Sequence, residues 1–168
     1  TLVGGGEYTE NDLLHCLRLA PDLVAADGGC NRLKGHIPKY IVGDLDSIID
    51  KEFWKSVGSE IIEIPEQETT DFEKCLYTIK TKVYFCLGFT GNRLDHFFAV
   101  CSSLLKYHEQ HVLVIGSHDV VLHLPTTFKI RLPKLTRVSL FPLKPVEGVR
   151  SKGLRWPIEE LSFDLGSR

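Results

Sequence analysis

The chain has 168 residues and a mass of 19.0 kDa, with 43% hydrophobic and 25% charged residues and a formal net charge of −2. These values are typical of one globular domain or two small ones, and they exclude a disordered or fibrous protein. No apolar run approaches the ~18–20 residues of a membrane span, and the negative charge disfavours phosphate-backbone binding, so we expect neither membrane nor nucleic acid as a partner.

Along the first two thirds of the chain, short apolar runs alternate with amphipathic stretches. The runs are rich in β-branched or aromatic residues and predict strands at 23–26, 40–42, 61–64, 83–87 and 112–115. The stretches between them predict helices at 10–19, 51–57, 71–80 and 95–107. This alternation predicts an α/β domain with a parallel sheet that is covered by helices on both faces.

The pattern changes after about Gly116. From there on the sequence predicts no helix, and prolines separate strand-like pieces at 120–124, 128–132, 137–142, 148–154 and 160–165. Residues 117–168 carry nine Lys and Arg against five Asp and Glu, whereas the acidic residues outnumber the basic ones before them. We therefore predict an α/β domain over 1–116, followed by a small antiparallel all-β sandwich over 117–168.

The five cysteines lie mostly in apolar runs, and none forms a C-x-x-C pair. This usage predicts buried, reduced thiols and a cytoplasmic protein. The sequence has no methionine and begins with Thr1, so we expect the natural protein to have further residues.

Four aspartates follow predicted strands: Asp27, the pair Asp44 and Asp46, and Asp95. The carboxyl ends of parallel strands meet at one edge of a sheet, where ligands bind. Asp44 and Asp46 are two residues apart and would point the same way in an extended backbone. Gathered carboxylates are costly without a cation, and an all-oxygen set favours Mg²⁺ over zinc. The alternative is that these Asp and Gly pairs form ordinary turns.

The predicted helix at 71–80 begins with a second group of polar residues. Thr70 and Glu73 fit a capping box, which explains both structurally. Lys74 lies on the same helical side as Asp71, and a helix start with a lysine suits a phosphate and its metal. Gln67 would add a hydrogen bond to the same phosphate site. The alternative for Lys74 is a plain surface lysine.

A glycine-rich turn leads into the helix predicted at 95–107. Gly88 and Gly91 would let backbone N–H groups approach phosphate oxygens, and Arg93 would bind two of them. His96 is explained equally well as a buried helix residue. Further along, Trp156 lies at a bend, where its ring would stack on a planar heterocycle or belong to the core.

In chain order, these motifs resemble those of the thiamine pyrophosphokinase family. They are ADGG at 26–29, GDLDS at 43–47, Gln67 with TDFxK at 70–74, GxxGxRxDH at 88–96 and GVxxxGLxWP at 148–157. The resemblance implies transfer of the terminal pyrophosphate of ATP to thiamine, which gives thiamine diphosphate and AMP. It also implies a homodimer, in which the α/β domain of one subunit and the β-sandwich of the other form each active site.

The resemblance also implies roles for particular residues. The expected Mg²⁺ ligands are Asp44, Asp46 and Asp71, and Asp27 and Asp95 would complete the acidic cluster. The residues expected to bind ATP are Asp27, Gln67, Thr70, Lys74, Gly91 and Arg93. Trp156 and Asp95 would contact thiamine. The catalytic residues would be Asp71, Asp95, Arg93 and Lys74, with either Asp71 or Asp95 as the general base.

Two departures from the family pattern stand out. The acid that usually precedes the motif glutamine is Glu66 here. The family's C-terminal Ser/Asn-containing stretch has no counterpart before Arg168, so we expect the β domain to be incomplete at that end. Two other functions fit the same residues: a Mg²⁺-dependent diphosphotransferase or nucleotide hydrolase with another acceptor, and a non-catalytic sensor of thiamine diphosphate or nucleotide.

Overall fold

The computed structural model describes residues 1–91 and 93–166 and divides the chain into two compact units. The first unit is Thr1–Thr126, and the second begins at Thr127. The division falls after Thr126 rather than after Gly116 because the strand that follows Gly116 joins the sheet of the first unit.

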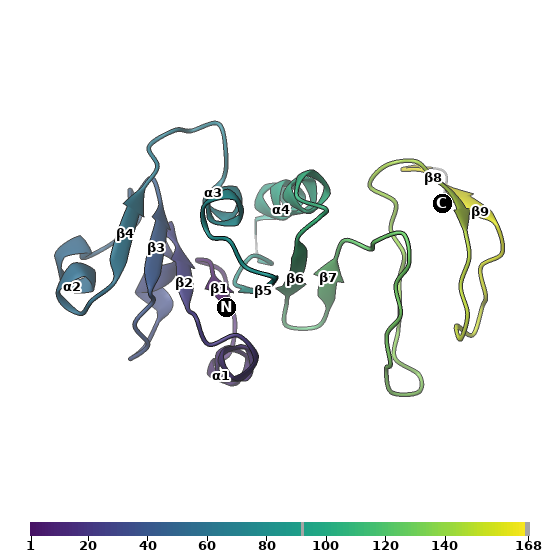
Figure 1. Ribbon diagram of the computed structural model, residues 1–168, viewed down its shortest axis with the longest axis horizontal. Helices are drawn as coiled ribbons and strands as arrows, with labels where there is room; N and C mark the ends of the chain where they lie inside the picture. Colours follow the sequence, from purple (N-terminus) through teal and green to yellow (C-terminus); the bar gives the residue numbers. More distant parts are fainter. Residues whose placement is uncertain (92, 167–168) are drawn as a thin grey trace. The chain divides into compact units, whose positions relative to one another are not determined.

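The first unit is built on a seven-stranded sheet with the strand order β4-β3-β2-β1-β5-β6-β7 (Figure 1). Neighbouring strands pair in parallel except β7, which runs antiparallel to β6 at the edge. The strands are β1 (Leu2–Val3), β2 (Val24–Ala26), β3 (Tyr40–Gly43), β4 (Glu60–Glu63), β5 (Val83–Leu87), β6 (His111–Ile115) and β7 (Val120–Leu122). The predicted mainly parallel α/β sheet is therefore confirmed.

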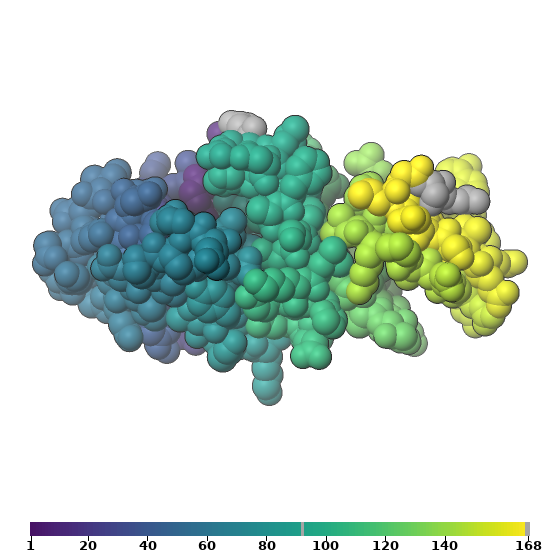
Figure 2. Space-filling model, turned by 90° about the horizontal axis from the view of Figure 1, so that it is seen from above, coloured from purple at the N-terminus to yellow at the C-terminus, as the bar shows by residue number. Residues whose placement is uncertain are grey.

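Helices cover both faces of this sheet, because successive strand residues point to opposite sides. On one face, α3 (Asp71–Thr78) and α4 (Leu94–Lys106) pack against Leu2, Val42 and Cys86. On the other face lie α1 (Glu10–Leu19), the 3₁₀ helix η1 (Asp27–Arg32) and the short α2 (Lys51–Ser56), which pack around Val3, Ile41 and Leu87. Figure 2 shows this unit from the side of α3 and α4, so little of the purple N-terminal segment is visible there.

The helices begin where local sequence provides caps. Thr9 forms a capping box with Asp12 at the start of α1, and the Asp50 side chain accepts from the Phe53 N–H at the start of α2. In α3, the spacing of Phe72, Cys75 and Leu76 places three buried side chains on one face.

The second unit contains one two-stranded antiparallel sheet, made of β8 (Val146–Val149) and β9 (Leu161–Phe163). The predicted antiparallel β region is thus confirmed as a small sheet, and the predicted strands at 128–132 and 137–142 are not paired in the described residues. Prolines at 133, 142 and 145 remove ladder donors in this stretch. Its apolar side chains, such as Ile130, remain exposed.

Among the described residues, no helix is both long and apolar enough to cross a membrane.

Candidate active site

Three aspartates meet at the carboxyl ends of β2 and β3. Asp27 directly follows β2 and Asp44 directly follows β3, and the two strands are parallel neighbours, with Ala26 opposite Val42. One carboxylate oxygen from each of Asp27, Asp44 and Asp46 lies within 4.8 Å of the other two. The predicted convergence of acids at the sheet edge therefore holds for these three residues.

Asp44 and Asp46 reach this group through a turn rather than through the extended backbone expected from their spacing. Leu45, between them, has φ +65° and is buried. The turn is closed by the Asp46 backbone N–H, which donates to Asp44 Oδ1 at 3.2 Å. Leu45 anchors the turn in the core beneath it, so both carboxylates are held at the surface of the sheet edge.

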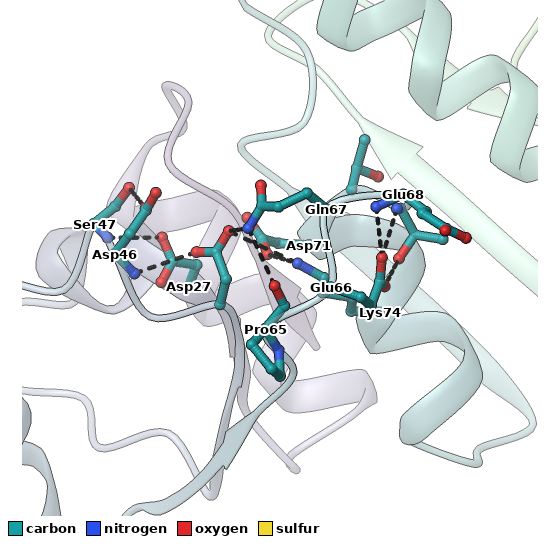
Figure 3. A network of polar contacts seen from close by, with 12 residues as sticks. Asp27, Asp46, Ser47, Pro65, Glu66, Gln67, Glu68, Asp71 and Lys74 are labelled. Carbon is teal, nitrogen blue, oxygen red and sulfur yellow. Dashed lines mark hydrogen bonds and ion pairs between the residues drawn. The ribbon is translucent and has the colours of Figure 1, made fainter.

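The Asp27 carboxylate is buried, and only one of its two oxygens accepts a hydrogen bond. Asp27 is 4% exposed. Its Oδ2 accepts from the Ser47 N–H at 3.2 Å, whereas Oδ1 has no hydrogen-bond partner (Figure 3). A buried carboxylate oxygen without a partner is costly. A cation would supply the missing partner, and three carboxylates without nitrogen or sulfur ligands suit Mg²⁺. The residues present thus fit a divalent hard metal ion.

Gly43, the last residue of β3, allows the acidic side chains to approach one another. A Cβ atom at this position would lie 2.7 Å from Asp27 Cβ and 3.0 Å from Asp71 Oδ1. Both distances are too short for an ordinary contact, so any larger residue would displace one carboxylate. Asp71 therefore lies beside the group formed by Asp27, Asp44 and Asp46.

Lys74 is buried under the carboxylates, at 1% exposure, and is not a surface lysine. Its Nζ lies 3.3 Å from Asp71 Oδ1 and 3.9 Å from Asp44 Oδ2. Burial raises the pKa of Asp71, although the Lys74 ammonium acts in the opposite direction; the charges of Asp27 and Asp44 raise it further. The lysine supplies one positive charge to a site that holds four carboxylates.

The loop between β4 and α3 brings Gln67 to the group. Gln67 Nε2 donates to Asp44 Oδ2 at 2.6 Å, and this bond, together with the Asp46 N–H, lowers the pKa of Asp44. Thr70 is the N-cap of α3 and accepts from the Glu73 N–H at 3.3 Å. The expected capping box is half formed, because the Glu73 carboxylate bonds to Lys106 and Tyr107 instead.

Arg93 and Asp95 pair with each other at the start of α4. Arg93 Nη2 lies 2.5 Å from Asp95 Oδ2, and Nε donates to Oδ1 at 3.2 Å. Both side chains are about two-thirds exposed, at 68% and 64%. The Arg93 guanidinium lowers the pKa of Asp95 to about 2. The structure therefore gathers three of the four strand-end acids and gives Asp95 a separate partner.

The glycines at the ends of β1 and β5 allow two loops to pack against each other. Gly4 N–H donates to the Leu87 carbonyl at 2.8 Å, and Gly6 N–H donates to the Gly88 carbonyl at 2.9 Å. A Cβ on Gly4 would lie 2.8 Å from the Gly88 oxygen, and Gly88 itself has φ +75°. These glycines are required by backbone contact, whereas Gly91 has open space around its Cα.

A cavity of about 230 Å³ adjoins Gly91 at the ends of β5 and β6. It is lined by Thr90, Gly91, Leu94, Phe97, Gly116, Ser117, His118, Asp119 and Val121. Gly116 keeps the two loops close, because a Cβ there would lie 2.9 Å from Thr90 Oγ1. No role was predicted from the sequence for residues 116–119. The signal was present, because Gly116 directly follows a predicted strand, as Gly43 and Gly88 do.

Trp156 lies in the second unit and is 75% exposed, so it does not belong to a core. The Arg155 guanidinium carbon lies 4.8 Å from the ring centroid. An exposed indole ring beside a cation is available for stacking on a planar ligand.

Known proteins share both this sequence pattern and this fold. The family model described as "Thiamin pyrophosphokinase, catalytic domain" matches residues 14–115, which is more than half of the chain. The chain belongs to the thiamin pyrophosphokinase family. It is 30% identical over 179 residues to thiamine pyrophosphokinase 2 from Oryza sativa subsp. japonica, a match that covers 86% of this chain and 67% of the relative.

Solved structures of thiamin pyrophosphokinases have the same fold. The Bacillus subtilis structure superposes with a TM-score of 0.78 at 22% identity and covers 99% of this chain and 84% of its own. The Candida albicans structure gives a TM-score of 0.58 at 23% identity, over 71% of this chain and 58% of its own. The chain thus spans less than two thirds of the Candida protein and about two thirds of the rice relative.

Membership of the thiamin pyrophosphokinase family confirms the predicted family and its enzyme class, a transferase. Two residues that organise the site, Ser47 and Glu66, were given no role from the sequence. Ser47 holds Asp27 through its backbone N–H, and Glu66 binds the loop that carries Gln67. Backbone donors leave no signal in a sequence, whereas Glu66 was visible beside the motif glutamine.

Proposed function

We propose that this chain transfers the terminal pyrophosphate of ATP to the hydroxyethyl group of thiamine with the help of Mg²⁺, releasing AMP. One observation carries the proposal: the unpartnered, buried Asp27 Oδ1 lies in a three-carboxylate group beside the buried Lys74. Pyrophosphoryl transfer requires alignment of the phosphates and neutralisation of their charge rather than covalent chemistry by the protein.

Asp27, Asp44 and Asp46 would hold the metal ion, because their oxygens already lie within reach of one another. Asp71 was expected from the sequence as a ligand beside Asp44 and Asp46; we propose Asp27 in that place, because the oxygens of Asp27, Asp44 and Asp46 lie within 4.8 Å of one another. Bound there, Mg²⁺ would supply the positive charge that neutralises phosphate oxygens. Gln67 holds Asp44 by a 2.6 Å hydrogen bond and so orients one of the ligands.

The residues around the acidic group would align the polyphosphate. Lys74 supplies a fixed positive charge from beneath the carboxylates, and Thr70 and the first N–H groups of α3 lie one turn before it. Arg93, exposed at the start of α4, offers a guanidinium that binds two phosphate oxygens at once. Its present partner Asp95 would then be released or would turn toward the substrate.

Asp71 is the better placed of the two candidate bases for the thiamine hydroxyl. It lies beside Asp27 and Lys74, outside the compact group of three ligands. Its raised pKa favours proton uptake. Asp95 is 64% exposed and pairs with Arg93 rather than with the acidic group.

We also propose that the chain acts as a homodimer and that Trp156 stacks on thiamine. Among the described residues of the second unit only Pro142 is buried. Exposed apolar side chains there include Phe128, Ile130, Leu132, Phe141 and Trp156. A surface of this kind is typical of a protein interface, and a second copy of this chain would cover it.

The five buried, unpaired cysteines agree with the predicted cytoplasmic location.

The test is a coupled measurement of AMP and thiamine diphosphate with Mg²⁺ and ATP, with and without thiamine. We expect both products in equal amounts, and only when thiamine is present. Release of AMP or another nucleotide product without thiamine would instead indicate a hydrolase or a transferase with another acceptor. Saturable binding of ATP without turnover would indicate a sensor.

A further inference from the structure

The loop from Pro65 to Thr70 is folded around the carboxylate of Glu66. Glu66 Oε2 accepts from the Glu68 N–H at 2.7 Å and from the Thr69 N–H at 2.9 Å (Figure 3). Glu66 Oε1 accepts from the Thr69 hydroxyl and, at 3.0 Å, from the Tyr77 hydroxyl. One side chain thus accepts four hydrogen bonds, and both of its oxygens are used.

Three of these bonds lie within the loop, and one fixes the loop to a helix. The backbone donors Glu68 and Thr69 lie in the loop, whereas Tyr77 lies in α3, near its end. Because α3 also carries Asp71 and Lys74, the Glu66 carboxylate connects the loop to the helix that forms one side of the acidic site.

Gln67 is the residue that this arrangement presents to the site. It lies next to Glu66 in the chain and donates to Asp44 Oδ2 at 2.6 Å, with a second, longer contact of 3.5 Å to the Pro65 carbonyl. Gln67 itself is exposed, so core packing does not hold it. Its backbone lies between Glu66 and the two N–H groups that donate to Glu66, those of Glu68 and Thr69.

We infer that Glu66 is a positioning residue, which acts through Gln67 to hold Asp44 in the orientation that binds Mg²⁺. This inference rests on the proposed function, since it concerns the same metal site. Glu66 does not touch the reacting groups. Its four donors require two acceptor oxygens, which a carboxylate supplies and a glutamine side chain, with one oxygen, does not.

The test compares Glu66→Ala, Glu66→Gln and Glu66→Asp with the wild-type chain. We expect Glu66→Ala to weaken the apparent Mg²⁺ affinity by about 10- to 100-fold, as for other residues that orient metal ligands. The affinity is measured without turnover, from the rise in melting temperature with Mg²⁺ and from Mn²⁺ binding followed by electron paramagnetic resonance. Glu66→Gln should lie close to Glu66→Ala, and Glu66→Asp should recover much of the loss.

Glu68→Ala is the matched control, because it removes the same charge from the same loop and Glu68 binds Glu66 only through its backbone N–H. We expect its Mg²⁺ affinity to equal that of the wild type. Tyr77→Phe provides a milder variant that removes one donor, and its effect should disappear in the Glu66→Ala background.

Four outcomes would overturn the inference. A Glu66→Ala variant that melts at a lower temperature without metal but binds Mg²⁺ with unchanged affinity would assign Glu66 a purely structural role. A Glu68→Ala variant with the same loss of Mg²⁺ affinity would assign the effect to the charge of the loop. A wild-type chain that binds no Mg²⁺ and releases no AMP would overturn the proposed function as well, whereas an active wild type with unaffected variants would overturn only the role of Glu66.

Discussion

The two units of the chain bury their apolar side chains to very different degrees. In the first unit Val3, Ile41, Val42 and Val114 are completely buried between the sheet and its helices. In the second unit residues with the same β-forming character, such as Ile130, stay more than half exposed. A strand-like pattern therefore becomes a stable layer only when another layer covers it. Four measurements test this difference between the two units.

The largest effect is expected at the metal site of the first unit. Asp44→Ala removes a carboxylate of the compact acidic group, and we expect kcat/KM to fall on the order of 10³-fold or more, equivalent to about 4 kcal/mol of transition-state stabilisation. The matched control is Asp22→Ala, because the Asp22 side chain is exposed and lies 3.8 Å from Lys39. Equal activity of the two variants in an AMP-release assay would contradict the proposed site.

A core variant should lower stability in the first unit irrespective of protein concentration. Leu76→Ala removes a fully buried side chain between α3 and the sheet. We expect the free energy of unfolding to fall by about 2–5 kcal/mol. The measurement is urea denaturation at two protein concentrations that differ 100-fold. A loss that changes with concentration would mean that the packing of the first unit also depends on a partner.

Charged substitutions should affect association only in the second unit. Ile130→Asp places a charge on the surface that we propose is covered by a second copy, so its mass in light scattering should shift from dimer toward monomer. Ile49→Asp is the matched control, because Ile49 lies in the first unit and is 85% exposed. A dimer that survives Ile130→Asp, or a wild type that is monomeric, would contradict the proposed interface.

The smallest effect is expected in acid. The four hydrogen bonds to Glu66 lower its pKa from 4.5 to about 2. Because the folded pKa lies below the unfolded one, its contribution to stability is present above about pH 4.5 and is lost as the pH falls toward 2. Glu66→Gln should therefore flatten the loss of stability over this range. Urea denaturation at pH 5 and pH 3 measures it, and identical pH dependence in both proteins would contradict the role of these bonds.

Much of the first unit could be predicted from the sequence, because its signals are local. Apolar runs at 40–42, 83–87 and 112–115, each followed by a glycine, predicted β3, β5 and β6, and Thr70 predicted the start of α3. The edge strand β7 was predicted as a strand of the second domain, whereas it pairs with β6 in the first unit, across a turn in which the Gly116 N–H donates to the Asp119 carbonyl. The strands predicted at 128–132 and 137–142 are not paired in the described residues, where no second layer covers their apolar side chains.

Local sequence encodes which residue types reach the carboxyl edge of the sheet, because it sets where each strand ends and which residues follow. How these residues pair depends on the packing of segments that are distant in the chain. It buried Lys74 beneath Asp71, brought Asp27 against Gly43, and left Asp95 at the surface with Arg93. Pairing and burial depend on the distance between segments far apart in the chain and on the water removed between them, and neither quantity is encoded in local periodicity.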